Sequence, residues 1–414
     1  MVRERHASHR AALLVNPLLR LGMSIPGVPS HQSFSTEILC GGVEVIEQVA
    51  TEWRSLCDDG QYHAPFYQPE WIAAYVRAFA GDQTVFLITA RLHGRLIAVL
   101  PLIQGIAWMG GIPLRKLRSA GNVHTCRFDL IHRPDIRDWA VNALWHALAS
   151  TPGWDALELS NVPYGGAAAD LVRLARGHGH GVVVTRAVTS PYLSLDAQGG
   201  SADAFLDRID AKFRSNLRRR MGKLRTRGPV ELVCTSTADE RLAQFYALER
   251  AGWKGHERSA VVCDSTTRQF YDEVAKPGYG RTRLRMYSLE CAGRPVAMYY
   301  GLRYDARYFL LKTAYDESLR ECSPGQLITQ EVLRALSVDR CVEFDFLGQQ
   351  MDWKRAWRPR LRPHANWHVF RGPVGQAAHR VRFQWGREVG RRMRSWVRIA
   401  KPDFGMPQSR ADSA

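Results

Sequence analysis

The sequence has no run approaching the roughly eighteen uncharged apolar residues that a membrane-spanning helix needs, so no such helix is predicted. Its eight cysteines form no CxxC pair and no cluster with histidine, so no zinc site is predicted and no metal cofactor is expected. Several of these cysteines stand inside apolar runs such as RCVEFDFL. That placement is typical of reduced, buried thiols in a cytoplasmic protein.

Other function classes lack their motifs. Helix-turn-helix, zinc-finger and aromatic-interleaved RNA motifs are missing, so sequence-specific DNA binding is not expected. No histidine lies beside a serine-containing elbow, and a Ser–His–Asp hydrolase is therefore not predicted. The N-terminus has too short an apolar core for a signal peptide and no cleavage site. We expect residues 1–33 to be a disordered leader, or Met23 to be the true start.

Acidic residues are absent where basic residues are most concentrated. The chain of 414 residues has a formal charge of +17, and residues 212–227 carry eight lysines and arginines with no acid. Residues 371–401 carry nine basic residues against Glu388 alone, so each of these two segments contributes +8. The remainder is close to neutral. This distribution indicates an enzyme-like body with two basic patches for anionic partners.

The first patch, KFRSNLRRRMGKLRTR, has helical periodicity. Phe213, Leu217, Met221 and Leu224 recur at i, i+4, i+8 and i+11, which predicts a helix that packs through one apolar stripe. Like charges at i, i+4 destabilise such a helix by a few tenths of a kcal/mol per pair, so an anionic partner would stabilise it. A tRNA backbone, a lipid-linked sugar or the phosphates of a small donor would each fit, and a solvated basic face is the alternative.

The second patch lies in the C-terminal tail, residues 373–414. Val381, Trp385, Val389, Met393 and Trp396 fall on one helical stripe. Four arginines of the tail form a second stripe. We predict a basic amphipathic helix whose residues 380–400 either contact a membrane surface or pack on their own domain.

An internal repeat organises the rest of the chain. Residues 84–103 predict two strands joined by a tight turn at His93-Gly94-Arg95, and residues 284–305 repeat this pattern around Ala292-Gly293-Arg294. Each hairpin is followed by a helical stretch and a short buried strand. The repeat predicts two α/β units, at 34–190 and 191–372, with a crossing strand and linker near 189–203.

The stretch AYDESLRECSPGQLITQEVLRAL, residues 314–336, is the sharpest local signal. A strand ends, a loop passes through Ser323-Pro324-Gly325, and a helix is predicted to start near Gln326. Free backbone N–H groups at a helix start form a site for a pyrophosphate, and a glycine lets the ligand approach closely. An ordinary strand-to-helix turn is the alternative.

Two further stretches carry candidate chemistry. FDFLGQQMDWKRAW, residues 344–357, places Asp345 at the end of a buried strand, with Lys354 beyond it and Trp357 at its end. The carboxylate could deprotonate an acceptor amine and the lysine could neutralise phosphate or an oxyanion, or the two could form a structural pair. In ERAGWKG, Trp253 and Lys254 could contact acceptor or donor, or simply end a helix.

The order of these motifs resembles the CelD-like, tandem-GNAT acyltransferases of cellulose and exopolysaccharide loci, which are similar in turn to Fem-type peptidyltransferases. The resemblance spans roughly residues 36–372. It is carried by FYQPEWIAAYVRAF, KFRSNLRRRMGKL, SPGQLITQEVLRAL and EFDFLGQQMDWKRAW. It implies a fold of two tandem GNAT-like domains, α/β, with mixed sheets flanked by helices.

The resemblance also implies site residues. Acyl-CoA, with acetyl-CoA foremost, would be held by Ser323, Gly325, Gln326 and Leu327. This sequence departs from the usual Gln/Arg-x-x-Gly-x-Gly/Ala cradle, because Cys322 occupies the first position and Leu327 the last. The first unit has no such cradle and is expected to be a degenerate copy.

The remaining site predictions assign roles around that cradle. Asp345 and Lys354 are predicted to be catalytic. Substrate contacts are predicted for Arg214, Arg218, Trp253, Lys254 and Trp357.

The leading hypothesis is an acyl-CoA-dependent N- or O-acyltransferase in the cytoplasm, acting on a sugar, polysaccharide or envelope precursor. A Fem-like transferase that uses aminoacyl-tRNA is the second hypothesis. The third is a non-catalytic accessory protein of exopolysaccharide or cellulose synthesis.

Overall fold

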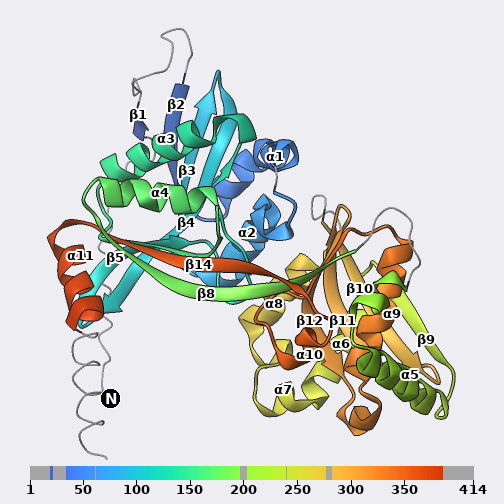
Figure 1. The fold of residues 1–414 in the computed structure, drawn as a ribbon. Helices are drawn as coiled ribbons and strands as arrows, with labels where there is room; N and C mark the ends of the chain where they lie inside the picture. The colour runs from blue at the N-terminus through green and yellow to red at the C-terminus, as the bar shows by residue number, and fades with distance from the viewer. Residues whose placement is uncertain are drawn as a thin grey trace, which may run out of the picture.

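A computed structural model describes residues 19–21, 34–60, 62–195, 203–238, 240–276 and 282–385 (Figure 1). Its strands form one mixed, 14-stranded sheet with the order β1-β2-β3-β4-β5-β7-β14-β8-β13-β12-β11-β10-β9, and β6 pairs with β4. Helices flank the sheet in both halves. The predicted α/β architecture, with mixed sheets flanked by helices, is confirmed, and the sheets of the two halves are continuous.

The first half contains the strands β2 (Phe34–Gly41), β3 (Thr84–Leu92), β4 (Arg95–Met109), β5 (Ile112–Ser119), β6 (Ile131–His132) and β7 (Ala156–Pro163). Its helices are α1 (Glu44–Asp59), α2 (Pro69–Tyr75), α3 (Arg137–Ser150) and α4 (Ala167–Gly177). Within the segment expected to be a disordered leader, β1 (Leu19–Leu21) pairs with β2. The rest of that leader lies outside the described residues.

The second half contains the strands β9 (Val230–Thr235), β10 (Thr282–Cys291), β11 (Arg294–Tyr304), β12 (Arg307–Tyr315) and β13 (Glu343–Asp345). Its helices are α5 (Ala211–Arg225), α6 (Glu240–Ala251), α7 (Trp253–His256), α8 (Ser265–Val274), α9 (Pro324–Val338) and α10 (Asp352–Arg355). A 3-10 turn, η6 (Glu317–Cys322), joins β12 to α9.

Both predicted hairpins are present. The β3–β4 turn has positive φ angles at His93 and Gly94, and the β10–β11 turn has them at Ala292 and Gly293. Two successive positive φ angles are the geometry of a type I′ turn, whose twist matches that of the flanking strands. The same local chemistry therefore builds the same hairpin twice.

Two long strands connect the halves (Figure 1). β8 (Gly181–Ser194) pairs with β13 at its end, and β14 (Arg360–Phe370) lies between β7 and β8. The predicted division at residue 190 therefore falls inside β8, and β14 returns from the second half to complete the sheet of the first. After β14 come α11 (Gly372–His379) and a π-helical turn (Arg380–Trp385), and the rest of the predicted tail helix lies outside the described residues.

The core is also shared between the halves. Trp71 of α2 packs edge-on against Phe270 of α8, with 5.1 Å between ring centroids. The Gln68 side chain donates a buried hydrogen bond of 2.8 Å to the Tyr304 hydroxyl. One apolar cluster contains residues of α1 and α2 together with residues of α6, α8 and β11. The relative position of the halves is therefore fixed by burial on this face of the sheet.

Candidate functional site

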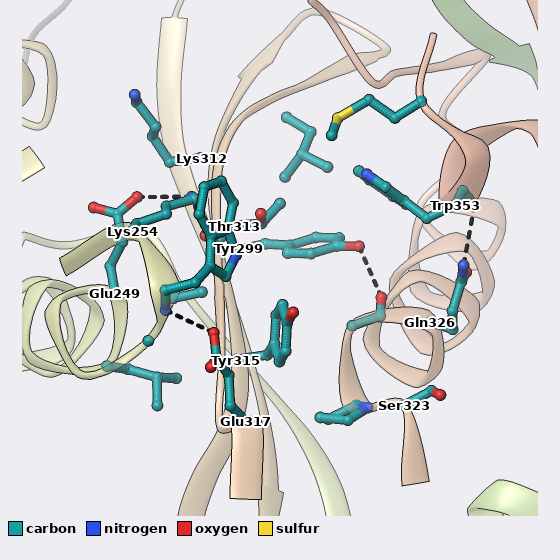
Figure 2. A pocket seen from close by; sticks show the side chains of 18 of the residues that line it. Glu249, Lys254, Tyr299, Lys312, Thr313, Tyr315, Glu317, Ser323, Gln326 and Trp353 are labelled. Atoms are coloured by element: carbon teal, nitrogen blue, oxygen red, sulfur yellow. Dashed lines mark hydrogen bonds and ion pairs between the residues drawn. The ribbon is translucent and has the colours of Figure 1, made fainter. Parts of the chain in front are cut away.

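A cavity of about 540 Å³ opens where β12 and β13 separate. The two strands pair only from Arg307 to Phe309 on β12, whereas β12 continues to Tyr315. Residues 310–315 of β12 line the cavity together with the end of α6, α7, the start of α9 and the loop after β13. The cavity thus reaches both faces of the sheet, with α6 and α7 on one side and α9 on the other (Figure 2).

The start of α9 presents one free amide to this cavity. Ser323 has a left-handed conformation with φ 49°, and its carbonyl accepts the N–H groups of Gln326 and Leu327. Pro324 has no N–H. Among the described residues, the Gly325 N–H has no acceptor, and a Cβ atom added there would meet only the Tyr315 ring, at 3.7 Å. This open helix N-terminus suits an anion.

The carbonyl side of the same turn is held by hydroxyl groups. The Thr329 hydroxyl donates to the Gly325 carbonyl at 2.8 Å, and the Tyr299 hydroxyl lies 3.3 Å from the same oxygen. Burial raises the pKa of Tyr299 above its usual value, so this hydroxyl remains a donor. Arg320, exposed at the cavity edge, adds a positive charge beside this turn.

Gln326 is predicted to bind the donor, but its side chain is engaged within the protein. Its Nε2 donates to the Trp353 carbonyl at 3.1 Å, and its Oε1 accepts from Trp357 Nε1 at 2.7 Å. Gln326 therefore ties α9 to the loop after β13. Its side chain can contribute to a ligand site only by shaping the wall of the cavity.

Two predicted contacts do not line the cavity. Trp357 is 1% exposed and packs edge-on against Phe213 of α5, so its indole belongs to the core and not to a substrate site. Leu327 is fully buried in the same core, on the inward face of α9. Both side chains are large and apolar, and their burial stabilises the packing of α5 and α9 on the sheet.

Asp345, predicted to be catalytic, is also absent from the residues that line the cavity. Its side chain is fully buried and forms ion pairs with Arg127 of the first half and, at 2.8 Å, with Arg362 of β14. It also accepts from the Leu347 N–H at 2.9 Å and the Ser190 hydroxyl at 3.3 Å. With its oxygens engaged in this way, the carboxylate joins the two halves and is not placed to take a proton from an acceptor.

Lys354 lines the cavity, yet its ammonium group points into the loop after β13. Nζ donates to the carbonyl oxygens of Leu347 at 2.7 Å and Gln349 at 2.8 Å, with that of Phe346 at 3.4 Å. Burial lowers the pKa of Lys354 to about 8. The predicted pair with Asp345 is absent from the described ion pairs, and the lysine instead holds the loop that forms one wall.

The opposite wall is built by α6 and α7. Trp253, 42% exposed, lies at the cavity, and its backbone N–H donates to Glu317 Oε1 at 2.6 Å. Lys254 Nζ donates to Glu249 Oε1 at 2.8 Å and to the Thr313 carbonyl at 2.6 Å (Figure 2). Both predicted contacts therefore line the site, and Lys254 fixes α7 to the open edge of β12.

Sequence reasoning missed Lys312 and its surroundings. Lys312 lies on β12 opposite Tyr300, on the face of the sheet away from α9. Its Nζ is 5.2 Å from the centre of the Tyr271 ring, and burial lowers its pKa. The Tyr271 hydroxyl lies 3.2 Å from Nδ1 of His124, which comes from the first half. The only sequence signal was one lysine inside the apolar strand YFLLKTAY.

The basic helix α5 packs as predicted. Leu217, Met221 and Leu224 are buried in the core of the second half, and Phe213 packs against it. The predicted substrate contacts lie outside the cavity: Arg214 bonds to Asp207 and to the Leu206 carbonyl, and Arg218 is exposed. Lys223 and Arg227 both bond to Glu321 of η6. Five basic residues of α5 have no ion pair among the described residues: Lys212, Arg218, Arg219, Arg220 and Arg225.

The first half differs at the corresponding place, between β5 and β7. These strands pair in parallel over Lys116–Arg118, as β12 and β13 do. Beyond that point residues 120–130 lie along β7, where the Phe128 N–H donates to the Asn161 carbonyl and the Asn161 amide donates to the Thr125 carbonyl. The chain itself thus occupies the place that the cavity takes in the second half.

Comparisons with known proteins agree with this architecture. Residues 211–355 match the family model of the acetyltransferase (GNAT) domain. No curated protein matches the chain. FemX has a TM-score of 0.54 and 10% sequence identity, with 80% of this chain and 98% of FemX covered.

Two further solved structures are similar at a lower score. A tandem GNAT protein from the clavulanic acid biosynthesis pathway has a TM-score of 0.46 and 17% identity, with 82% of this chain and 99% of that chain covered. L-PGS from Bacillus licheniformis has a TM-score of 0.46 and 10% identity, with 81% and 96% covered.

Residues 211–355 are thus an acetyltransferase domain of the GNAT type, and the protein is an acyltransferase. A GNAT domain implies an acyl-CoA donor. In the described part of the chain, no group of His, Cys, Asp and Glu side chains is arranged to hold a metal ion. No described helix combines the length and apolar character needed to span a membrane.

Proposed function

We propose that the protein transfers an acyl group from acyl-CoA, with acetyl-CoA the first candidate, to an amine or hydroxyl of a sugar, polysaccharide or envelope precursor. The observation that supports this most is the continuous cavity from the free Gly325 amide at the start of α9 to the open edge of β12. A donor with a diphosphate and a thioester at the end of a long arm fits such a site.

The residues present fit the donor in three respects. The Gly325 N–H would donate to a diphosphate oxygen at the positive end of the α9 dipole, and Arg320 would add positive charge at the cavity edge. The absence of a side chain at Gly325 leaves the approach open. The gap between β12 and the loop after β13 would receive the arm, with Tyr299 and Phe346 as part of its wall.

Backbone groups at the open edge of β12 would stabilise the reaction. The Thr313 carbonyl is bonded by Lys254, so it faces away from β11. In an extended strand the N–H and C=O of one residue point the same way, which turns the Thr313 N–H toward the gap. There it would donate to the carbonyl oxygen of a thioester as negative charge develops. The acceptor would attack directly, so the proposal requires positioning and no covalent enzyme intermediate.

Binding of acetyl-CoA tests this proposal. Isothermal titration calorimetry should show saturable binding to the wild-type protein. Gly325→Asp places a carboxylate beside the diphosphate and should weaken binding by at least about tenfold. Gly222→Asp, on α5 outside the cavity, is the matched control and should bind acetyl-CoA as the wild type does. Absence of binding by acetyl-CoA and by longer acyl-CoAs would defeat the proposal.

The acceptor class rests on the CelD-like resemblance alone, and a cytoplasmic location and a membrane contact through residues 380–400 also remain predictions. A second candidate donor, aminoacyl-tRNA, is supported by the five basic residues of α5 that have no ion pair among the described residues. Such a donor would give co-purified tRNA and a binding constant that falls steeply with salt. Acetyl-CoA binding without either property favours the first proposal.

A further inference from the structure

Lys312 introduces a positive charge that the protein does not balance. Lys312 is partly buried, and no ion pair joins it to an acid among the described residues. Glu249 is the acid that acts on it, but Glu249 Oε1 is bonded to Lys254 and Oε2 accepts the Val261 N–H. A cation removed from water without a counter-ion is destabilising. The Glu249 carboxylate is thus paired with Lys254 and not with Lys312.

The other neighbours of Lys312 contribute no counter-charge. Burial lowers the pKa of His124 to about 4, so that its imidazole is neutral near pH 7. Tyr271 presents its ring to the ammonium group, and a ring face attracts a cation without neutralising it. Burial raises the pKa of the Cys126 thiol, also from the first half, so this neighbour too is uncharged near pH 7. The unbalanced charge at this wall therefore resides on Lys312.

The position of Lys312 separates it from the donor site. Lys312 lies on the α6 and α8 face of the sheet, and the free Gly325 amide lies at the start of α9 on the other face. Figure 2 shows Lys312 and the Glu249–Lys254 pair on one side of β12, with Ser323 and Gln326 on the other. A diphosphate at the start of α9 would lie on the other face of the sheet from Lys312. A counter-charge for Lys312 would therefore come from a molecule that enters on the α6 and α8 side.

We propose that the acceptor carries an anionic group, a carboxylate or a phosphate, which pairs with Lys312 and orients the nucleophile toward the open edge of β12. This inference rests on the proposed function, because it assigns the side of the cavity opposite the donor to the acceptor. A charge-assisted hydrogen bond between Lys312 and such a group would be stronger in this partly desolvated site than in water. Lys312 is then a specificity-determining residue.

Matched acceptors test the proposal. With acetyl-CoA as donor, release of the CoA thiol is measured with glucosamine, glucosamine 6-phosphate and muramic acid, and with L-alaninamide and L-alanine. The phosphate and carboxylate members distinguish the two anion chemistries. We expect the wild-type protein to prefer at least one anionic member over its neutral counterpart by about tenfold or more in kcat/KM, as for other hydrogen bonds to charged groups.

Substitution of Lys312 locates the preference. Lys312→Met should raise the KM of the anionic acceptors and so remove most of the preference, while the kinetics of the neutral acceptors stay unchanged. Lys312→Arg should retain the preference. Lys223→Met, an exposed lysine of α5 outside the cavity, is the matched control. Acetyl-CoA calorimetry on Lys312→Met should give the wild-type affinity, which shows that the variant is folded and that the donor site is intact.

Three results would overturn the inference. In the first, the wild-type protein prefers no anionic acceptor, either because it acetylates the neutral acceptors as well or better, or because it acetylates none of the acceptors. In the second, Lys312→Met lowers kcat equally for charged and neutral acceptors, which would assign the lysine to proton transfer. In the third, the preference survives Lys312→Met. Failure of the proposed function is distinguishable from all three, because the wild-type protein would then not bind acetyl-CoA.

Discussion

Replacement of Asp345 by asparagine should lower the free energy of unfolding without abolishing donor binding. The carboxylate is fully buried, and its partner Arg127 is 6% exposed. The amide of Asp345→Asn can still accept from the Leu347 N–H, so the change mainly removes the counter-charge of Arg127. Loss of one partner of a buried ion pair costs about 3–5 kcal/mol, because the other charge stays buried.

The assay is urea unfolding followed by tryptophan fluorescence, with acetyl-CoA calorimetry on the folded protein. We expect a lower urea midpoint for Asp345→Asn and an unchanged affinity for acetyl-CoA. Combining Asp345→Leu with Arg127→Met should recover part of the loss, since an apolar pair of similar volume leaves no buried charge unpaired. A variant with the wild-type midpoint and no acyl transfer would refute this reasoning and restore the catalytic role.

Three further substitutions test the contacts that hold the walls of the cavity in place. Burial lowers the pKa of Lys354 to about 8 in the folded protein against about 10.4 in an unfolded chain, so the unfolded state binds more protons between these values. Urea titrations should therefore show the stability of the wild type, relative to Lys354→Met, rising with pH across that window; a difference independent of pH would contradict the shift. Lys254→Met leaves the Glu249 carboxylate buried without its cation, so thermal unfolding should show a loss of about 3 kcal/mol or more. Trp357→Phe removes the bond to Gln326 Oε1, and a loss of about 1 kcal/mol with unchanged transfer kinetics is expected.

The sequence predicted those features that depend on neighbouring residues. The two hairpins follow from strand periodicity around turns with two positive φ angles, and the buried stripe of α5 follows from helical spacing. The helix after the turn at Ser323 was also predicted, and it begins two residues earlier than expected, at Pro324. These signals are local, so a single sequence contains them.

Contacts between distant residues could not be predicted from the sequence. Asp345 was interpreted as a catalytic carboxylate because its partner Arg127 lies 218 residues away in the first half. The pairing of β14 with β7 also joins segments that lie far apart in the sequence, on opposite sides of the predicted boundary. Lys312 is one lysine in an apolar strand, and its unbalanced charge appears only when Glu249 is seen to bond to Lys254. Such arrangements arise from tertiary packing, which periodicity does not encode.

The central claim is that the cavity between the start of α9 and the open edge of β12 binds an acyl-CoA donor. A crystal structure determined with acetyl-CoA tests it most directly. The account predicts the diphosphate within hydrogen-bonding distance of the Gly325 N–H and the thioester beside Thr313. A donor bound in the first half, or at the basic face of α5 with the cavity empty, would contradict it.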